Sequence, residues 1–267
     1  MGRSRLSSVG IALLGIVAVL GGMTAFAGPA AASSQYAALG DSYASGVGSR
    51  NYYSDSGSCY RSPSAYAVLD AARVGATLTF NACSGAQTAD VQNNQLGGLS
   101  STTRWVTVQV GGNDAGFSSV ITTCAEPAWL GNCNSAVAGA QNTIRNTLPG
   151  RLDALYNAIR SHATTAKVVV VGYPRLFNGE DCNAATFFSP SDESLLNQTA
   201  DLMDSTLSAR ASAHGFLFVN PESAFVGHAV CDSSEWINGL SNPIMESYHP
   251  NTSGQTGYAN LVDDDLT

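Results

Sequence analysis

Ser42 and four histidines are the side chains with which this 267-residue chain could transfer an acyl group. Ser42 follows Gly40 and Asp41, directly after the apolar run at residues 37–39. A serine hydroxyl attacks a carbonyl carbon only when a base within hydrogen-bond reach takes its proton. Gly-Asp-Ser also forms ordinary turns, because aspartate and serine bond the local backbone. The turn therefore indicates chemistry only together with a base elsewhere in the chain.

The chain offers four candidate bases, which are His162, His214, His228 and His249. His162 is expected at the C-terminal end of a helix and His214 just before a strand, so structural roles are favoured for both. His228 lies in a loop near Cys231 and stays a candidate. His249 follows the last expected strand, in a Tyr-His-Pro-Asn sequence before the final helix, and is the favoured base.

Alternating apolar strands and amphipathic helices would position these residues. The expected strands span residues 35–39, 76–81, 105–110, 167–171 and 216–220. The expected helices span residues 63–73, 134–162 with a break at Pro149-Gly150, 191–213 and 257–266. Valines fill the fourth strand, which is typical of a strand buried on both faces. The pattern predicts an α/β fold, a three-layer α/β/α sandwich with a mostly parallel five-stranded sheet.

Three expected strands end in glycine-containing turns with a hydroxyl or amide side chain. These turns contain Ser42, Ser84-Gly85 and Gly112-Asn113. Carboxyl ends of parallel strands meet at one edge of the sheet, where ligands of open α/β folds bind. Taken singly, Asn113 fits a turn former and Gly85 the start of a helix. Asp41, beside Ser42, is expected to bond the turn or the following helix.

Residues 1–32 are typical of a secretory signal peptide. Arg3 and Arg5 precede an apolar stretch at residues 9–20, and small residues offer cleavage near Ala27 or Ala32. A membrane anchor is the alternative, but it needs about 20 apolar residues and glycines interrupt this stretch. We expect one domain at residues 33–267, secreted and without stable membrane insertion after cleavage.

The mature chain carries ten basic and twenty acidic residues. This balance argues against nucleic acid or an anionic membrane surface as the main partner. Six cysteines in an exported chain predict three disulfides, although fifteen pairings are possible. The cysteines are Cys59, Cys83, Cys124, Cys133, Cys182 and Cys231. Their spacing does not indicate a zinc site, and nothing indicates another metal, an organic cofactor or an oligomer, so we expect a monomer.

Four short blocks in this order resemble the GDSL or SGNH hydrolases, in particular the secreted bacterial lipase and esterase branch that includes phospholipase A1. The resemblance runs from about residue 36 to the C-terminus and implies that the cysteine pairs match those of secreted relatives. It implies that Ser42 is the nucleophile and His249 the base. It further implies an oxyanion hole made of the Ser42 and Gly85 N–H groups and the Asn113 side-chain amide.

The sequence departs from the family three residues before the base, where the usual aspartate is Glu246. A glutamate can orient a histidine in the same way. Some members of this branch use instead the main-chain carbonyl two residues before the histidine, which is that of Ser247 here. Both remain candidates, and the carbonyl is favoured.

The resemblance implies a secreted serine ester hydrolase that forms an acyl-enzyme on Ser42. Phospholipase A1 and polysaccharide O-acetyl esterase are alternatives with the same residues, and a non-catalytic binding protein on this fold is an alternative of a different class. Aromatic loop residues are expected either to line an apolar groove for medium-chain or aryl esters or to pack the loops. They are Tyr43, Tyr52, Tyr53, Phe117, Trp129, Phe187 and Phe188.

Overall fold

The computed structural model describes residues 1–2 and 34–266. The expected signal peptide, apart from its first two residues, and both expected cleavage sites lie outside the described residues. In the described part of the chain, no helix is long and apolar enough to cross a membrane.

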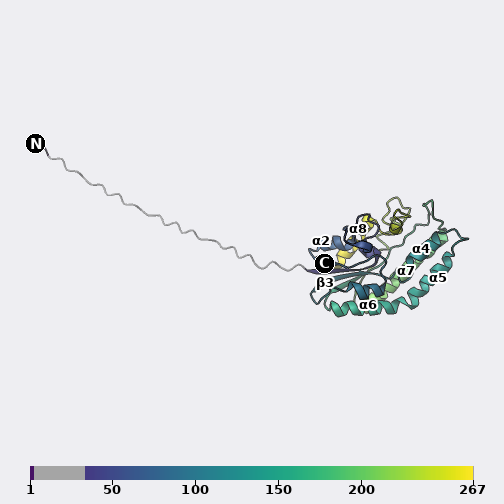
Figure 1. Ribbon diagram of the computed structural model, residues 1–267, viewed down its shortest axis with the longest axis horizontal. Helices are drawn as coiled ribbons and strands as arrows, with labels where there is room; N and C mark the ends of the chain where they lie inside the picture. Colours follow the sequence, from purple (N-terminus) through teal and green to yellow (C-terminus); the bar gives the residue numbers. More distant parts are fainter. Residues whose placement is uncertain (3–33, 267) are drawn as a thin grey trace. The chain divides into compact units, whose positions relative to one another are not determined.

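Five parallel strands form one sheet in the order β2-β1-β3-β4-β5. The strands are β1 (Gln35–Gly40), β2 (Thr77–Phe80), β3 (Thr103–Gln109), β4 (Lys167–Val171) and β5 (Leu217–Val219). The predicted five-stranded sheet is confirmed, and every pairing is parallel. All carboxyl ends therefore lie at one edge, toward the right in Figure 1.

Helices cover both faces of this sheet (Figure 1). On one face lie α2 (Tyr66–Arg73) and α8 (Thr252–Leu266); on the other lie α4 (Phe117–Ala125), α5 (Cys133–Asn146), α6 (Leu148–His162) and α7 (Pro190–Ala213). Short helices are α1 (Ser42–Ser45), α3 (Thr88–Asp90), η1 (Gly57–Cys59), η2 (Val91–Gln95) and η3 (Ile244–Glu246). The predicted three-layer sandwich is confirmed.

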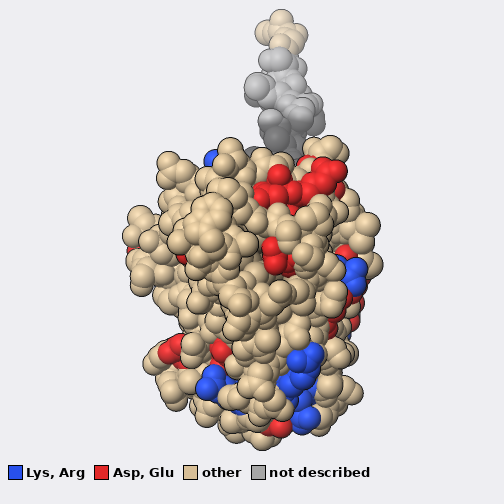
Figure 2. Space-filling model, turned by 90° about the vertical axis from the view of Figure 1, so that its right-hand side faces the viewer, with Lys and Arg blue, Asp and Glu red and all other residues tan. Residues whose placement is uncertain are grey.

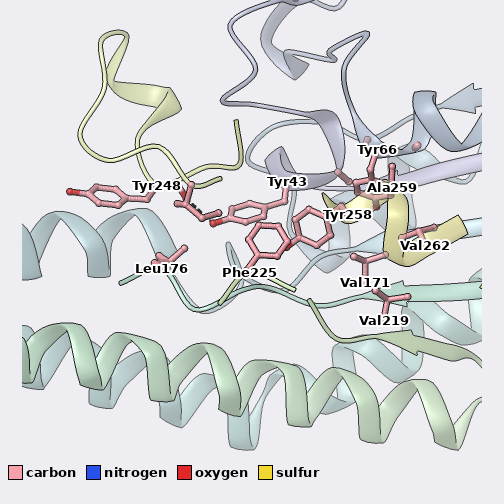
Figure 3. Close-up of a cluster of buried hydrophobic side chains, with 14 of the residues drawn as sticks. Tyr43, Tyr66, Val171, Leu176, Val219, Phe225, Tyr248, Tyr258, Ala259 and Val262 are labelled. Carbon is pink, nitrogen blue, oxygen red and sulfur yellow. Dashed lines mark hydrogen bonds between the residues drawn. The ribbon is translucent and has the colours of Figure 1, made fainter. Parts of the chain in front are cut away.

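Side chains of β1 enter both hydrophobic cores, because successive strand residues point to opposite faces of the sheet. Tyr36 and Ala38 belong to the core that includes residues of α2 and α8. Ala37 and Leu39 belong to the core that includes residues of α6 and the C-terminal half of α7. Figure 3 shows part of the first core, where Tyr66 and Tyr258 lie with their rings 5.7 Å apart. Both faces of the sheet are thus covered by apolar side chains and shielded from solvent.

Several helix starts differ from the sequence prediction, and α2 begins at Tyr66 rather than at residue 63. α7 begins at Pro190 rather than at residue 191, because Ser189 and Asp192 form a reciprocal capping box. α8 begins at Thr252 rather than at residue 257, and the Asn251 side chain accepts hydrogen bonds from the first free N–H groups.

The predicted helix break at Pro149-Gly150 is also wrong by two residues. The chain changes direction at Thr147, and Pro149 lies in the first turn of α6. Proline is tolerated there because its missing N–H has no partner in that turn. α4 was not predicted, because its short sequence lies within a stretch that reads as a loop after the third strand.

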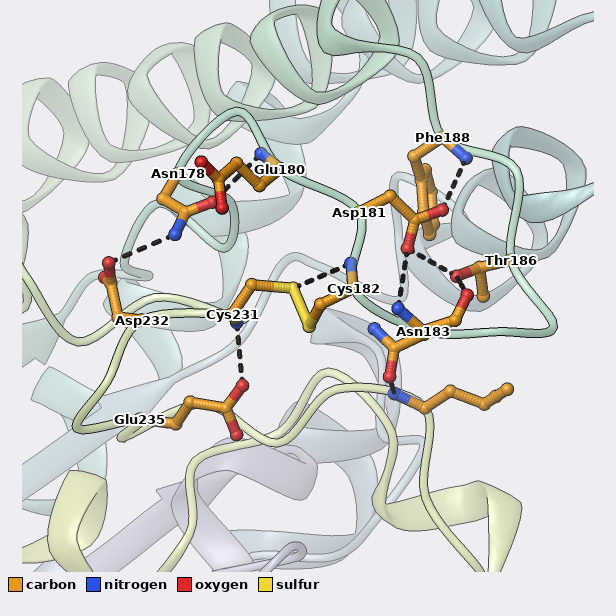
Figure 4. The surroundings of a disulfide bond; sticks show 11 residues. Asn178, Glu180, Asp181, Cys182, Asn183, Thr186, Phe188, Cys231, Asp232 and Glu235 are labelled. Atoms are coloured by element: carbon orange, nitrogen blue, oxygen red, sulfur yellow. Dashed lines mark hydrogen bonds between the residues drawn. A yellow bond between two sulfur atoms is a disulfide. The ribbon is translucent and has the colours of Figure 1, made fainter.

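Three disulfides join the six cysteines in sequence order: Cys59–Cys83, Cys124–Cys133 and Cys182–Cys231. The third joins two loops at the carboxyl edge (Figure 4). Beside it, the Asp181 carboxylate accepts hydrogen bonds from the backbone N–H groups of Asn183 and Phe188. The loops at the carboxyl edge are therefore fixed by covalent and polar contacts.

Gly40→Ala should destabilise the protein, because Gly40 has φ +135° and an added Cβ would lie against the Gln109 backbone carbonyl. We expect the free energy of unfolding to fall by about 2 kcal/mol or more. Gly139→Ala is the matched control, since a Cβ there meets no atom within 4 Å. In helix α5 that substitution should instead stabilise by about 0.5–1 kcal/mol. Urea unfolding of both variants measures the contrast, and equal effects would contradict this account.

Candidate active site

The turn that carries Ser42 is held in place by hydrogen bonds from the neighbouring elements. The Asp41 N–H donates to the Gln109 carbonyl of β3 at 2.9 Å. The Gln95 side chain bonds both the N–H and the carbonyl of Gly40, at 2.7 and 2.9 Å. Asp41 caps α1 by accepting a hydrogen bond from the Tyr43 N–H at 3.0 Å. The position of the buried Ser42 side chain is therefore set by the backbone on both sides.

His249 meets Ser42 across 207 residues of sequence. Its Nε2 lies 2.8 Å from the Ser42 Oγ, and its Nδ1 lies 2.8 Å from the Ser247 carbonyl oxygen. A carbonyl only accepts hydrogen bonds, so Nδ1 carries the proton in the neutral ring and Nε2 accepts from the serine hydroxyl. This tautomer is the one that a base for Ser42 requires.

Burial keeps the His249 ring uncharged. It lowers the pKa of His249 to about 4, and the hydrogen bond to the Ser247 carbonyl opposes that shift. The ring also packs beside Tyr43, at 5.2 Å between centroids, and beside Phe117, at 6.2 Å. A neutral imidazole is able to accept a proton at ordinary pH.

Glu246 turns away from the histidine ring. Its Oε1 accepts a hydrogen bond from the Tyr52 hydroxyl at 2.6 Å, and its Oε2 lies 3.3 Å from the Arg50 Nε. Of the two candidates named from the sequence, the Ser247 carbonyl is the one whose contact with the ring is found among the described residues. Glu246 instead fixes the loop from which that carbonyl projects.

The Gly85 and Asn113 turns lie beside the Ser42 turn. The Cys83 N–H donates to the Gly40 carbonyl at 3.0 Å, which ties the Gly85 turn to the end of β1. The Asn113 amide donates to the Ala86 carbonyl at 3.1 Å. Gly85 has φ +80°, a conformation that favours glycine. A Cβ built at this residue would meet no atom within 4 Å, so no neighbouring group covers that side of its backbone. The structure therefore brings all four block residues to the same edge of the sheet.

Tyr173 is a residue that the sequence analysis left without a role. Its hydroxyl donates to the Asp41 carboxylate at 2.6 Å and accepts from the Gly112 N–H at 3.4 Å. The Asp204 carboxylate holds its backbone N–H at 2.8 Å. Burial raises the pKa of Asp41 to about 7, and the Tyr173 hydrogen bond opposes that shift. The Gly-Tyr-Pro turn after the fourth strand was the available signal, since it lies at the same edge.

The other three histidines make contacts elsewhere. His162 Nδ1 lies 2.9 Å from the Ala158 carbonyl at the end of α6, and His214 Nε2 lies 2.9 Å from Asp153. His228, the alternative base, stacks on the Trp236 ring at 3.9 Å. The structure does not bring these three side chains to Ser42.

An apolar cavity begins at Ser42 and extends between α4, α5 and α7. Its wall includes Ala140 and Ile144 of α5, and Leu196, Ala200 and Met203 of α7. Residues three and four apart line one face of a helix, so the cavity runs along both helices.

Two of the seven expected aromatic residues, Tyr43 and Phe117, line this cavity. The other five do not line it, and Tyr52 and Phe188 follow the alternative expectation of packing the loops. Phe188 is buried in the core and Tyr52 bonds Glu246, while Tyr53, Trp129 and Phe187 are exposed.

The lowered pKa of His249 predicts a stability change with pH. The unfolded state binds a proton near the ordinary histidine pKa of about 6.5, whereas the folded state binds one only near pH 4. Stability should therefore fall as pH drops from about 6.5 toward 4, by about 3 kcal/mol in total from this group. His249→Gln should lack that part of the slope. Urea unfolding of both proteins at several pH values measures it, and identical slopes would contradict the prediction.

Comparison with known proteins agrees with this geometry. Residues 38–256 match the GDSL-like Lipase/Acylhydrolase family. The chain is 44% identical over 243 residues to Lipase 1 of Streptomyces coelicolor, which covers 90% of this chain and 89% of that protein. It superposes on the crystal structure of phospholipase A1 from Streptomyces albidoflavus NA297 with a TM-score of 0.82 and 41% identity, covering 88% of this chain and 100% of that chain.

The crystal structure of an extracellular lipase from Streptomyces rimosus is similar to the same degree. Its TM-score is 0.81 and its identity 40%, covering 87% of this chain and 100% of that chain. The parallel sheet, the matched blocks and these relatives agree. The chain therefore belongs to the GDSL-like lipase/acylhydrolase family of carboxylic ester hydrolases.

Proposed function

We propose that this ester hydrolase uses Ser42 as its nucleophile and His249 as its general base. The observation that carries the proposal is the His249 ring, with a serine hydroxyl 2.8 Å from Nε2 and a carbonyl oxygen 2.8 Å from Nδ1. We assign the oxyanion hole to the Ser42 and Gly85 N–H groups and the Asn113 amide. The Asn113 amide has a second hydrogen besides the one that Ala86 accepts.

The reaction follows from these assignments. His249 Nε2 takes the Ser42 hydroxyl proton as Oγ attacks the ester carbonyl carbon, and the carbonyl electron pair moves to its oxygen. The oxyanion donors hold that charge. The tetrahedral intermediate then breaks its bond to the alcohol oxygen, which takes the proton from Nε2. Water attacks the acyl-enzyme in the same way, and the proton returns to Ser42 as the acid leaves.

Fluorophosphonate labelling of the oxidised protein tests the assignment. The wild type should label and turn over p-nitrophenyl esters, and Ser42→Ala should do neither. His249→Ala should label and turn over about 10³-fold more slowly or worse, since the serine loses its base. A folded wild type that neither labels nor hydrolyses any ester would overturn the proposal.

Glu246→Gln tests whether the Glu246 carboxylate, rather than the Ser247 carbonyl, orients the His249 ring. Its carboxylate bonds Tyr52 and Arg50 rather than the ring, so kcat should fall less than about tenfold. A loss of 10³-fold would instead assign the orientation of the base to this carboxylate.

The apolar cavity supports lipid esters with a medium-length acyl chain as the substrate class. Away from the polar residues at Ser42, its wall includes apolar side chains of α4, α5 and α7 together with Pro174 and Leu176. An acetyl group would leave most of that wall without contact, so the cavity favours longer acyl chains over the O-acetyl esterase alternative. Phospholipid is a second candidate substrate, supported by the 41% identity to a phospholipase A1.

Secretion is the remaining part of the proposal. The rimosus relative is described as an extracellular lipase. Disulfide bonds form and persist in oxidising compartments. The three disulfides of this chain therefore support its export.

Ala200→Leu should shorten the acyl chain that the enzyme accepts, because the added carbons enter the cavity. We expect kcat/KM for a C10 ester to fall about tenfold or more while that for a C4 ester changes less than about threefold. Ala213→Leu, on an exposed part of the same helix, is the matched control and should leave the profile unchanged. p-Nitrophenyl esters of increasing length give the profile. An equal loss at every length would show that the cavity does not hold the acyl chain.

A further inference from the structure

Four large apolar side chains are exposed on loops and on the short helix η3 at the carboxyl edge of the sheet. They are Trp129 (81% exposed), Leu130 (68%), Phe187 (55%) and Ile244 (70%), and we call them the apolar rim. Single exposed apolar residues are common on soluble proteins. A group of four on neighbouring loops needs a physical reason, because each leaves a large apolar area in water.

The loops of the apolar rim contact one another. The Phe187 N–H donates to the Ala125 carbonyl at the end of α4, at 3.1 Å, which joins its segment to the loop of Trp129. On its other side, the Asn183 side chain accepts from the Leu240 N–H at 3.2 Å. That contact joins the segment to the loop of Ile244. The segments that carry the rim are thus joined to one another by hydrogen bonds.

The rim loops are continuous in the chain with elements of the cavity wall and of the His249 loop. Trp129 and Leu130 follow α4, which supplies Phe117, Val120 and Ile121 to the cavity wall. Ile244 stands three residues before Ser247, whose carbonyl holds the His249 ring. An apolar phase in contact with the rim would therefore touch loops that are continuous with α4 of the cavity wall and with the segment that holds His249.

The charges of these loops indicate which kind of lipid surface the rim could contact. Residues 126–134, 183–189 and 236–247 contain no lysine or arginine, and the whole chain has a net charge of −8. Figure 2 looks onto this end of the molecule, and uncharged residues cover most of its middle. Anionic lipid attracts basic patches, so these loops do not fit it. They fit an uncharged or zwitterionic surface.

We propose that the apolar rim docks the enzyme on the surface of aggregated zwitterionic or uncharged lipid. Trp, Leu, Phe and Ile side chains enter the boundary between headgroups and acyl chains, where such residues bind. Docking holds the enzyme at the lipid surface through loops that continue into α4 of the cavity wall. The inference rests on the proposed function, because it names where that site meets its substrate.

The experiment compares two variants with the wild type. Trp129→Ser with Leu130→Ser removes half of the rim and touches none of the residues assigned to catalysis. Leu217→Thr is the control, since Leu217 is 39% exposed at the start of β5, at the opposite edge of the sheet. Thermal unfolding verifies that both variants are folded.

Binding is measured by cosedimentation with phosphatidylcholine vesicles, with each protein also carrying Ser42→Ala so that no lipid is consumed. Hydrolysis is measured on monomeric p-nitrophenyl butyrate and on an emulsified long-chain ester. The rim variant should bind vesicles about tenfold more weakly and lose a similar factor on the emulsion. Its rate on the monomeric ester should match the wild type, as should every property of the Leu217→Thr control.

Three outcomes would overturn the inference. Unchanged vesicle binding by the rim variant would exclude the rim as the docking surface. Tighter binding to phosphatidylglycerol than to phosphatidylcholine would show that charge directs docking. A wild-type dimer in light scattering that the rim variant abolishes would assign the rim to a second copy of the chain. Failure of the proposed function is distinguishable, because it would abolish hydrolysis of the monomeric ester by the wild type and leave vesicle binding intact.

Discussion

The hydrogen bond between the His249 Nδ1 and the Ser247 carbonyl sets the tautomer on which the rest of the site depends. A carbonyl dipole orients the ring without the full negative charge that a carboxylate would place beside it. Burial therefore dominates, and the pKa of His249 falls well below its ordinary value. The ring stays neutral and able to accept a proton, while an imidazolium formed in the proposed reaction would receive less stabilisation than a carboxylate would give.

A backbone carbonyl orients a ring only if its loop is rigid. The Tyr43 hydroxyl donates to the Tyr248 carbonyl at 2.7 Å, and Figure 3 shows this side chain pointing to that backbone. Asn238 forms backbone hydrogen bonds with Tyr248 and His249, both at 2.9 Å. Glu246 is buried beside Tyr52 and holds the same loop from the other side. Its carboxylate thus acts on the loop rather than on the base.

Much of the fold and of the candidate site was predictable from the sequence. Buried parallel strands leave unbroken apolar runs, and the turns that follow them carry the residues that meet at Ser42. The helix boundaries were less predictable, because Ser189 and Ser191 are both possible N-caps, and the start of α7 is fixed by the capping box between Ser189 and Asp192. Tyr173 was missed as well, since its role depends on a contact with Asp41 that is 132 residues away in sequence.

The group that orients His249 was harder to predict for a different reason. Every residue has a carbonyl, so Ser247 leaves no signature in the sequence, whereas Glu246 carries the side chain expected of a triad. The cavity is also invisible in sequence, because it arises where small residues such as Ala140 and Ala200 let α5 and α7 leave space between them.

Two disulfides help explain how large apolar side chains remain exposed beside an apolar cavity. A free loop bearing Trp129 and Leu130 would gain by folding over the cavity and covering its wall. The Cys124–Cys133 bond closes that loop with a sequence separation of nine, and Cys182–Cys231 anchors the start of the segment that carries Phe187. Short closed loops have few conformations available. The same bonds thereby limit how far the loops of the apolar rim can fold back onto the rest of the molecule.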